Sequence, residues 1–254
     1  MATIVIDPGH YDKYNPGVCP GYYEGNAMLK LAKFLGAELT AKGANVKYTR
    51  TTDDQRPSLE QRGAMGAGAD LFISLHSDAA DSPTVRGVTS FYSVRQPDSK
   101  DFAEQIGIAV SDAMGNPFRG AITRPSTTSP GYDYFGVIRS SVAAGAKNSF
   151  LIEHGFHTNP QDCAILNSDD GLRRIARAEA DAIARHFGLE SSGAAPTPPQ
   201  AGCCMFKYTV QPGEYLFIIA KKFGVSWETI AAANSLMPPY ILHPGQTLTI
   251  PLCP

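Results

Sequence analysis

The clearest structural signal in the chain is the run Leu151-Ile152-Glu153-His154-Gly155-Phe156-His157-Thr158-Asn159-Pro160. The apolar residues at its start are typical of a short strand that is covered on both faces. Gly155 and the Asn159-Pro160 pair then break that pattern. A carboxylate at the end of a buried strand needs either a partner or a raised pKa. The run therefore predicts that Glu153 lies at a metal site or in a structural ion pair.

Short apolar runs alternate with amphipathic segments on both sides of this run, up to residue 188. Strands are expected at residues 2–6, 45–49, 69–75, 87–92, 133–138 and 148–153. Helices are expected over residues 24–42, from residue 58 on, over 98–114 and over 168–187. The second helix should begin with a capping box, Ser58-Leu59-Glu60-Gln61. Residues 116–131, rich in Pro, Gly, Ser and Thr, should form a loop. The alternation predicts an α/β domain with a mainly parallel twisted sheet flanked by helices.

Three of the expected strands end in side chains that titrate or bind metals. His10 follows the first strand, His76 follows the strand at residues 69–75, and Glu153 ends the strand discussed above. Ligands of such sheets bind outside the carboxyl ends of the strands. A shared site at this edge is the functional interpretation, whereas hydrogen-bonded structural histidines are the alternative.

A catalytic zinc site takes three protein ligands, usually histidines and a carboxylate, and keeps a fourth position open. The two histidines and one carboxylate would satisfy this requirement. Glu24 is favoured because it begins the first expected helix, just after the loop that carries His10. Three other carboxylates lie closer to a histidine in sequence and remain open: Asp7, Asp12 and Asp78.

Composition argues against several classes of function. The formal net charge is −2 and 18% of the residues are charged, so neither a nucleic-acid surface nor a polybasic membrane patch is expected. No stretch approaches the roughly 18 apolar residues that span a bilayer, so we expect no membrane insertion. No basic segment followed by an apolar one precedes Ile4, which predicts synthesis in the cytoplasm without a signal peptide. The five cysteines are irregularly spaced and are interpreted as thiols.

The composition changes after residue 188. Residues 189–204 are rich in Pro, Ser and Gly and are expected to be a linker. Residues 205–254 have the pattern of a strand, two short helices and a second strand, which describes a small βααβ C-terminal module.

Residues 1–188 resemble the zinc-dependent N-acetylmuramoyl-L-alanine amidases of the amidase 3 family. Five groups of residues carry the resemblance, in the order of the family: Ile6-Asp7-Pro8-Gly9-His10, Glu24-Gly25, Thr49-Arg50, the run from Ala69 to His76, and Ile152-Glu153-His154-Gly155-Phe156 with Asn159-Pro160. The resemblance implies that His10, Glu24 and His76 hold one Zn²⁺ ion and that Glu153 is the catalytic carboxylate.

Residues 205–254 look like a LysM module, which binds peptidoglycan or chitin. The matching stretches are Tyr208 to Glu214, Ile219-Ala220 with Phe223-Gly224-Val225, Ile230 with Asn234, and Pro244 to Pro251. The run Tyr215-Leu216-Phe217 departs from the usual polar-led start of the first helix. The residues that would contact glycan, by this resemblance, are Gly213, Glu214, Tyr215, Tyr240 and Ile241.

Other residues near these motifs are given lesser roles. We expect His154 and His157 to contact the ligands or the substrate rather than the metal. Arg62 and Arg86 either meet carboxylates of the stem peptide or are ordinary surface charges. We do not expect Cys163 to be a nucleophile, because nothing in the sequence pairs it with a base. Trp227 is expected to belong to the core of the module.

The combined resemblance implies a peptidoglycan hydrolase. Zinc-activated water would cleave the amide bond between N-acetylmuramic acid and L-alanine, with Glu153 as general base and then general acid. Such an enzyme would act on the cell wall after release, as a phage endolysin or a sporulation-type autolysin. Two alternatives remain: a LysM-anchored peptidoglycan-binding protein without catalysis, and a zinc peptidase that cuts the stem peptide.

Overall fold

A computed structural model of the chain describes residues 1–189, 204–211, 214, 216–236 and 242–252. The chain divides into two compact units, Met1–Ala184 and Arg185–Pro254. Each unit is considered by itself. Most of the expected linker, residues 189–204, lies outside the described residues.

The first unit is built on a six-stranded sheet with the order β2-β1-β3-β6-β4-β5. Its strands are β1 (Thr3–Pro8), β2 (Asn45–Tyr48), β3 (Leu71–Asp78), β4 (Val88–Tyr92), β5 (Phe118–Ile122) and β6 (Ser149–Phe156). Strands β2, β1, β3 and β6 run parallel to one another, β4 is antiparallel to β6, and β5 is parallel to β4. The predicted mainly parallel sheet is therefore confirmed.

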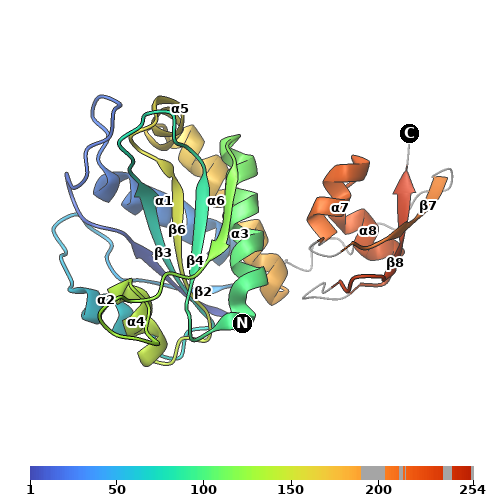
Figure 1. Cartoon of the computed structure of the whole chain (residues 1–254), viewed down its shortest axis with the longest axis horizontal. Coiled ribbons are helices and arrows are strands. Elements are labelled where there is room, and N and C mark those ends of the chain that lie inside the picture. Colours follow the sequence, from blue (N-terminus) through green and yellow to red (C-terminus); the bar gives the residue numbers. More distant parts are fainter. Residues whose placement is uncertain (190–203, 212–213, 215, 237–241, 253–254) are drawn as a thin grey trace. The chain divides into compact units, whose positions relative to one another are not determined.

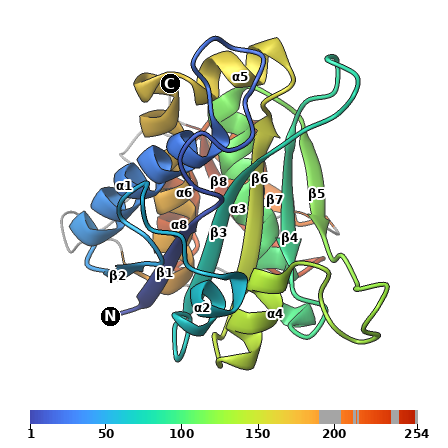
Figure 2. The ribbon, with the colours of Figure 1, turned by 90° about the vertical axis from the view of Figure 1, so that its left-hand side faces the viewer.

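Helices cover both faces of this sheet (Figure 1). They are α1 (Glu24–Ala41), α2 (Leu59–Ala64), the 3-10 turn η1 (Pro97–Ser99), α3 (Lys100–Met114), α4 (Gly136–Ala143), α5 (Pro160–Leu166) and α6 (Asp169–Phe187). Figure 2 shows α2 and α4 in front of the sheet and α3 and α6 behind it. On the face of α2 and α4, Val137 and Ile138 pack with Phe72 and Leu151. On the other face, the rings of Phe102 and Phe150 lie 5.2 Å apart.

The helix boundaries follow local sequence signals. The predicted capping box is present, because the Ser58 hydroxyl accepts from the Gln61 amide and the Gln61 side chain accepts from the Ser58 amide. The apolar stripe of α1 is fully buried at Met28, Leu31, Leu35 and Leu39. Those positions have the i, i+3, i+4 spacing of an amphipathic helix.

Two sequence predictions for this unit are wrong. Residues 133–138 were expected to be a strand, but α4 begins at Gly136, because Val137, Ile138 and Ser141 form one buried helical face. Residues 116–131 were expected to be a loop, but they contain β5. This strand is a half-exposed edge with a glycine in its middle, so it lacks the apolar pattern of the buried strands.

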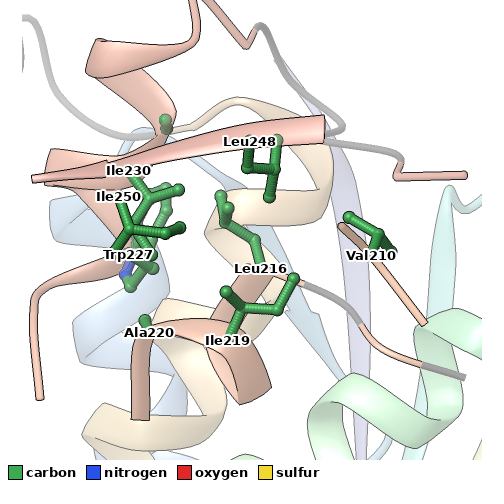
Figure 3. Packing of buried hydrophobic residues seen from close by; sticks show 9 residues of the cluster. Val210, Leu216, Ile219, Ala220, Trp227, Ile230, Leu248 and Ile250 are labelled. Atoms are coloured by element: carbon green, nitrogen blue, oxygen red, sulfur yellow. The ribbon is translucent and has the colours of Figure 1, made fainter. Parts of the chain in front are cut away.

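The second unit contains β7 (Cys204–Thr209), α7 (Leu216–Phe223), α8 (Trp227–Ala233) and β8 (Thr247–Leu252). Strands β7 and β8 pair antiparallel, so the predicted βααβ module is confirmed. Figure 3 shows its core, in which Trp227 lies with Ile230 and Ile250, as expected, while Leu216 and Leu248 lie nearby. Among the described residues, no helix combines the length and the apolar character needed to cross a bilayer.

Candidate metal centre and active site

Three potential metal ligands meet at the carboxyl ends of the parallel strands. His10 follows β1, Glu24 is the first residue of α1, and His76 lies near the end of β3. Their ligand atoms all lie within 4.8 Å of one another. His76 Nδ1 is 3.0 Å from Glu24 Oε1, and His10 Nε2 is 3.5 Å from Glu24 Oε2. The fold therefore brings together the three side chains that the sequence placed in one site.

The backbone around His10 is held tightly. Gly9 packs so closely against the His76 ring that a Cβ atom at this position would lie only 2.4 Å from His76 Cε1. His10 itself has φ 51°, a conformation that costs free energy in residues other than glycine and is common at functional sites. The buried Arg50 guanidinium donates to the carbonyls of Gly9 at 3.2 Å and Gly25 at 2.7 Å. Arg50 thus ties the His10 turn to the start of α1.

Glu24 is almost fully buried and is oriented by two further donors. Asn15 Nδ2 donates to Oε2 at 2.7 Å, and the Ser77 amide donates to Oε1 at 3.0 Å. Burial by itself would raise the pKa of Glu24, but the hydrogen bond and charge of His76, with His10 and Asn15, outweigh it and lower this pKa to about 2. No sequence pattern indicated a role for Asn15 or Ser77 at this site.

His10 is held in the form that binds metals. Burial lowers the pKa of His10 to about 4, although the charge of Glu24 opposes this shift. At neutral pH the site therefore offers a neutral imidazole beside an ionised carboxylate. Both are the protonation states that metal coordination requires.

Glu153 lies on β6 directly beside His76, its register partner on β3. Register partners on neighbouring strands have side chains on the same face of the sheet. Glu153 Oε2 is buried and has no hydrogen-bond partner. Burial, followed by the charges of Glu24 and Asp78, raises the pKa of Glu153 well above that of an ordinary carboxyl group. Glu153 is thus a half-buried carboxyl group whose Oε2 is unpaired, beside a candidate metal ligand.

The alternative carboxylates have other surroundings. Asp7 is fully buried and accepts from Arg62 Nε at 2.7 Å and Arg62 Nη2 at 2.6 Å. Asp12 and Asp78 are not part of the ligand group. The geometry thus favours Glu24 among the four carboxylates that the sequence left open.

The two arginines that were candidates for contact with stem-peptide carboxylates are already paired. Arg62 is committed to Asp7, as described above. Arg86 Nη2 lies 3.1 Å from the buried Asp162. Both arginines therefore act in the structure as partners of buried carboxylates.

The histidines that flank Glu153 lie outside the ligand group. His154 Nδ1 donates to the His76 carbonyl oxygen at 3.1 Å, and His157 Nδ1 lies 3.1 Å from the Ser77 carbonyl oxygen. Cys163 is buried, and its sulfur accepts from the Cys19 amide at 3.1 Å. Burial and the neighbouring Cys19 thiol raise the pKa of Cys163 to about 12, which disfavours a thiolate nucleophile.

A pocket of about 740 Å³ opens beside the ligand group. His10 and His76 line it, as does the start of α4 at Gly136 and Val137. The other lining side chains are mainly aromatic or cationic: Tyr11, Tyr14, Arg50, Arg56, Arg62, Tyr134 and Phe135. The pocket is large enough for several residues of a peptide substrate.

The donor set fits a zinc ion. Two imidazoles and one carboxylate are a common ligand set of catalytic zinc, and their ligand atoms converge. The unpaired Oε2 of Glu153 lies on the strand next to His76, as expected when its partner is a group that binds beside the three ligands.

Of the expected glycan contacts in the second unit, only Glu214 is among the described residues. Its carboxylate accepts from the Tyr208 hydroxyl at 2.7 Å and from the Gln211 amide at 2.9 Å. Gly213, Tyr215, Tyr240 and Ile241 lie outside the described residues.

Comparison with known proteins is consistent with both units. Residues 4–185 match the profile of the N-acetylmuramoyl-L-alanine amidase family, and residues 208–251 match that of the LysM domain. The chain is 32% identical to the N-acetylmuramoyl-L-alanine amidase LytC of Bacillus subtilis, over 73% of this chain and 35% of LytC. It is 31% identical to the probable cell wall amidase LytH of Staphylococcus epidermidis, over 73% of this chain and 58% of LytH.

A solved structure shares the fold of the first unit. The catalytic domain of CwlV, an N-acetylmuramoyl-L-alanine amidase from Bacillus (Paenibacillus) polymyxa var. colistinus, superposes with a TM-score of 0.64 at 27% identity. The match covers 75% of this chain and 100% of that domain. The match to the amidase profile covers most of the chain, and the relatives agree with it. The chain belongs to the N-acetylmuramoyl-L-alanine amidase family and carries a LysM domain as its second unit.

Proposed function

We propose that the protein hydrolyses the amide bond between N-acetylmuramic acid and L-alanine in peptidoglycan. The observation that carries this proposal is the convergence of His10, Glu24 and His76 beside the unpaired carboxyl group of Glu153. A buried carboxyl oxygen without a partner calls for an explanation, and a substrate or water bound beside the three ligands would supply one.

His10, Glu24 and His76 would hold a single zinc ion. When bound, zinc supplies a Lewis acid that polarises the scissile carbonyl and makes water a stronger nucleophile at neutral pH. Glu153 takes the proton of the attacking water and delivers it to the departing alanine nitrogen. The raised pKa of Glu153 suits the second role, because a carboxyl group that holds its proton more firmly can protonate an amine leaving group near neutral pH.

The pocket of about 740 Å³ would receive the substrate beside the scissile bond. Its charged lining residues are Arg50, Arg56 and Arg62, and no carboxylate is among the residues that line it. Peptidoglycan stem peptides carry free carboxylates, so the charge of the pocket complements them. The LysM domain would bind glycan strands of the same polymer, with Gly213, Glu214, Tyr215, Tyr240 and Ile241 as candidate contacts.

The two units together suit a lytic enzyme of the cell wall. A wall-binding domain on the same chain raises the local concentration of scissile bonds around the catalytic unit. We infer that the protein acts on the wall after release, as an endolysin or an autolysin.

The test is the loss of turbidity of purified cell walls, with mass analysis of the soluble products. The proposed activity gives new alanine amino termini without new reducing sugars, is abolished by a chelator and returns with zinc. New amino termini inside the stem peptide would indicate a zinc peptidase instead. Walls that retain the protein but are not cleaved would indicate a binding protein without catalysis.

A further inference from the structure

The pairing between β3 and β6 contains a β-bulge, which lies directly after the paired residues His76 and Glu153. His76 pairs with Glu153 and Asp78 pairs with Phe156, so two residues of β6, His154 and Gly155, face the single residue Ser77 of β3. Gly155 has φ 80°, which a glycine adopts without strain. This bulge interrupts the regular ladder, and the backbone groups around it need other partners.

Side chains of the site supply those partners. The His76 carbonyl accepts from His154 Nδ1 at 3.1 Å. The Ser77 amide donates to Glu24 Oε1 at 3.0 Å, and His157 Nδ1 lies 3.1 Å from the Ser77 carbonyl. The bulge therefore lies next to the candidate metal centre, and at the bulge the His76 carbonyl accepts from a side chain instead of from the backbone of β6.

The His154 side chain lies on the face of the sheet opposite to that of Glu153, where it contacts Glu179 of α6. Its Nε2 lies 3.4 Å from Glu179 Oε2, and both side chains are fully buried. Glu179 Oε1 has no hydrogen-bond partner. A buried histidine and carboxylate cost free energy that an apolar pair would not, so the packing of this layer alone does not explain them.

A carboxylate behind the second ring nitrogen fixes the orientation and tautomer of an imidazole. In this chain the contact between Glu179 and Nε2 fixes the orientation of the His154 ring, so that Nδ1 faces the carbonyl of a candidate zinc ligand. A carbonyl oxygen only accepts, so the proton of this hydrogen bond lies on Nδ1. The same peptide carries the Cα of His76, so its position sets where the His76 ring lies.

We propose that His154 is a positioning residue for the metal centre, which holds the His76 carbonyl through Nδ1–H and is itself oriented by Glu179. This inference rests on the proposed zinc site at His10, Glu24 and His76. It assigns no contact with zinc or substrate to His154.

Two variants of similar polarity separate positioning from general destabilisation. In His154→Asn the amide nitrogen takes the place of Nδ1 and still reaches the His76 carbonyl, whereas in His154→Gln it takes the place of Nε2 and reaches only Glu179. The measurement is the zinc affinity of the full chain, by competition with a chromophoric chelator. We expect His154→Gln to lower the affinity about 10- to 100-fold, the range for partners behind metal ligands, and His154→Asn to retain most of it.

The control is Leu39→Ala, which removes a fully buried side chain near the end of α1 that lies far along the helix from Glu24. It should lower stability and leave zinc affinity unchanged. Equal affinities in the two His154 variants, or a loss in Leu39→Ala as large as in His154→Gln, would overturn the proposal. If His154→Gln does not fold, Glu179→Met tests the same chain of contacts, and wild-type zinc affinity in that variant would overturn it.

The results that would refute the proposed function differ from those that would refute the role of His154. Wild-type protein that binds no zinc, or that binds zinc and cleaves no amide, would count against the amidase activity. The comparison among variants measures only how His154 affects zinc binding.

Discussion

Replacing Arg62 by methionine should destabilise the first unit by about 3–5 kcal/mol, the cost of removing one partner of a buried ion pair. Asp7 is fully buried, and two of its four close contacts are the paired hydrogen bonds from Arg62 at 2.7 and 2.6 Å. The other two are hydroxyl groups, those of Ser74 and Thr49. Two hydroxyls do not neutralise a carboxylate, so the variant would keep a buried, uncompensated charge at Asp7 on β1. That cost is a large part of the 5–15 kcal/mol that stabilises a typical domain.

The pH dependence of this loss has a definite sign. In the wild type, burial would raise the pKa of Asp7, but the charge and hydrogen bonds of Arg62, with Ser74 and Thr49, outweigh it and lower this pKa below its ordinary value. The stability that Asp7 contributes is thus present above the unfolded pKa, near 3.9, and is lost as pH falls through the folded pKa. Without Arg62, burial raises the folded pKa instead, so the variant gains stability as pH falls. The difference between wild type and variant should therefore be smaller at pH 5 than at pH 8.

The assay is urea unfolding of the full chain, followed by far-UV circular dichroism in the presence of a chelator, so that metal binding does not contribute. A matched control is Lys147→Met, which breaks an exposed pair with Asp70 and should cost at most about 1 kcal/mol. The double variant Asp7→Leu with Arg62→Met should recover much of the loss, because no charge then stays buried. A cost for Arg62→Met no larger than that of Lys147→Met would refute the reasoning.

Three further predictions concern the metal site and the second unit. Gly9→Ala should weaken zinc binding in equilibrium dialysis, because the new Cβ would lie 2.4 Å from the His76 ring; unchanged affinity would show that the turn can move. Glu24→Gln should abolish tight zinc binding while the fold, followed by circular dichroism, persists, since it removes the anionic ligand; stoichiometric zinc in this variant would point to another carboxylate. Removing residues 203–254 should weaken binding to intact walls, measured by co-sedimentation, more than cleavage of small soluble muropeptides; equal losses on both substrates would argue against separate roles for the two units.

Much of the site is predictable because its residues stand at ends of strongly patterned elements. The apolar runs before His76 and Glu153 are unambiguous strands, and parallel strands bring their carboxyl ends to one edge of a sheet. Glu24 follows from the start of an amphipathic helix whose stripe includes Met28 and Leu31. These features depend only on local pattern and on the topology of parallel sheets.

The remaining features depend on contacts between residues that are distant in sequence. The apolar run at Phe135 to Ile138 is compatible with a strand or a helix, and only packing of Val137 and Ile138 against the sheet decides for α4. Strand β5 forms because β4 offers a free edge, not because its own residues require it. Ser77 acts through its backbone amide, which donates to Glu24, and no side-chain pattern reports such a group.

The most direct test of the proposed mechanism is the zinc content and turnover of Glu153→Gln on a soluble muropeptide. Glu153 lies beside the ligand group and is not one of the three ligands, so the variant should still bind one zinc ion. Turnover should fall at least about a hundredfold, because the glutamine amide cannot accept the proton of water or return it to the leaving nitrogen. Turnover near that of the wild type, with zinc bound, would contradict the assignment of Glu153 as general base and acid.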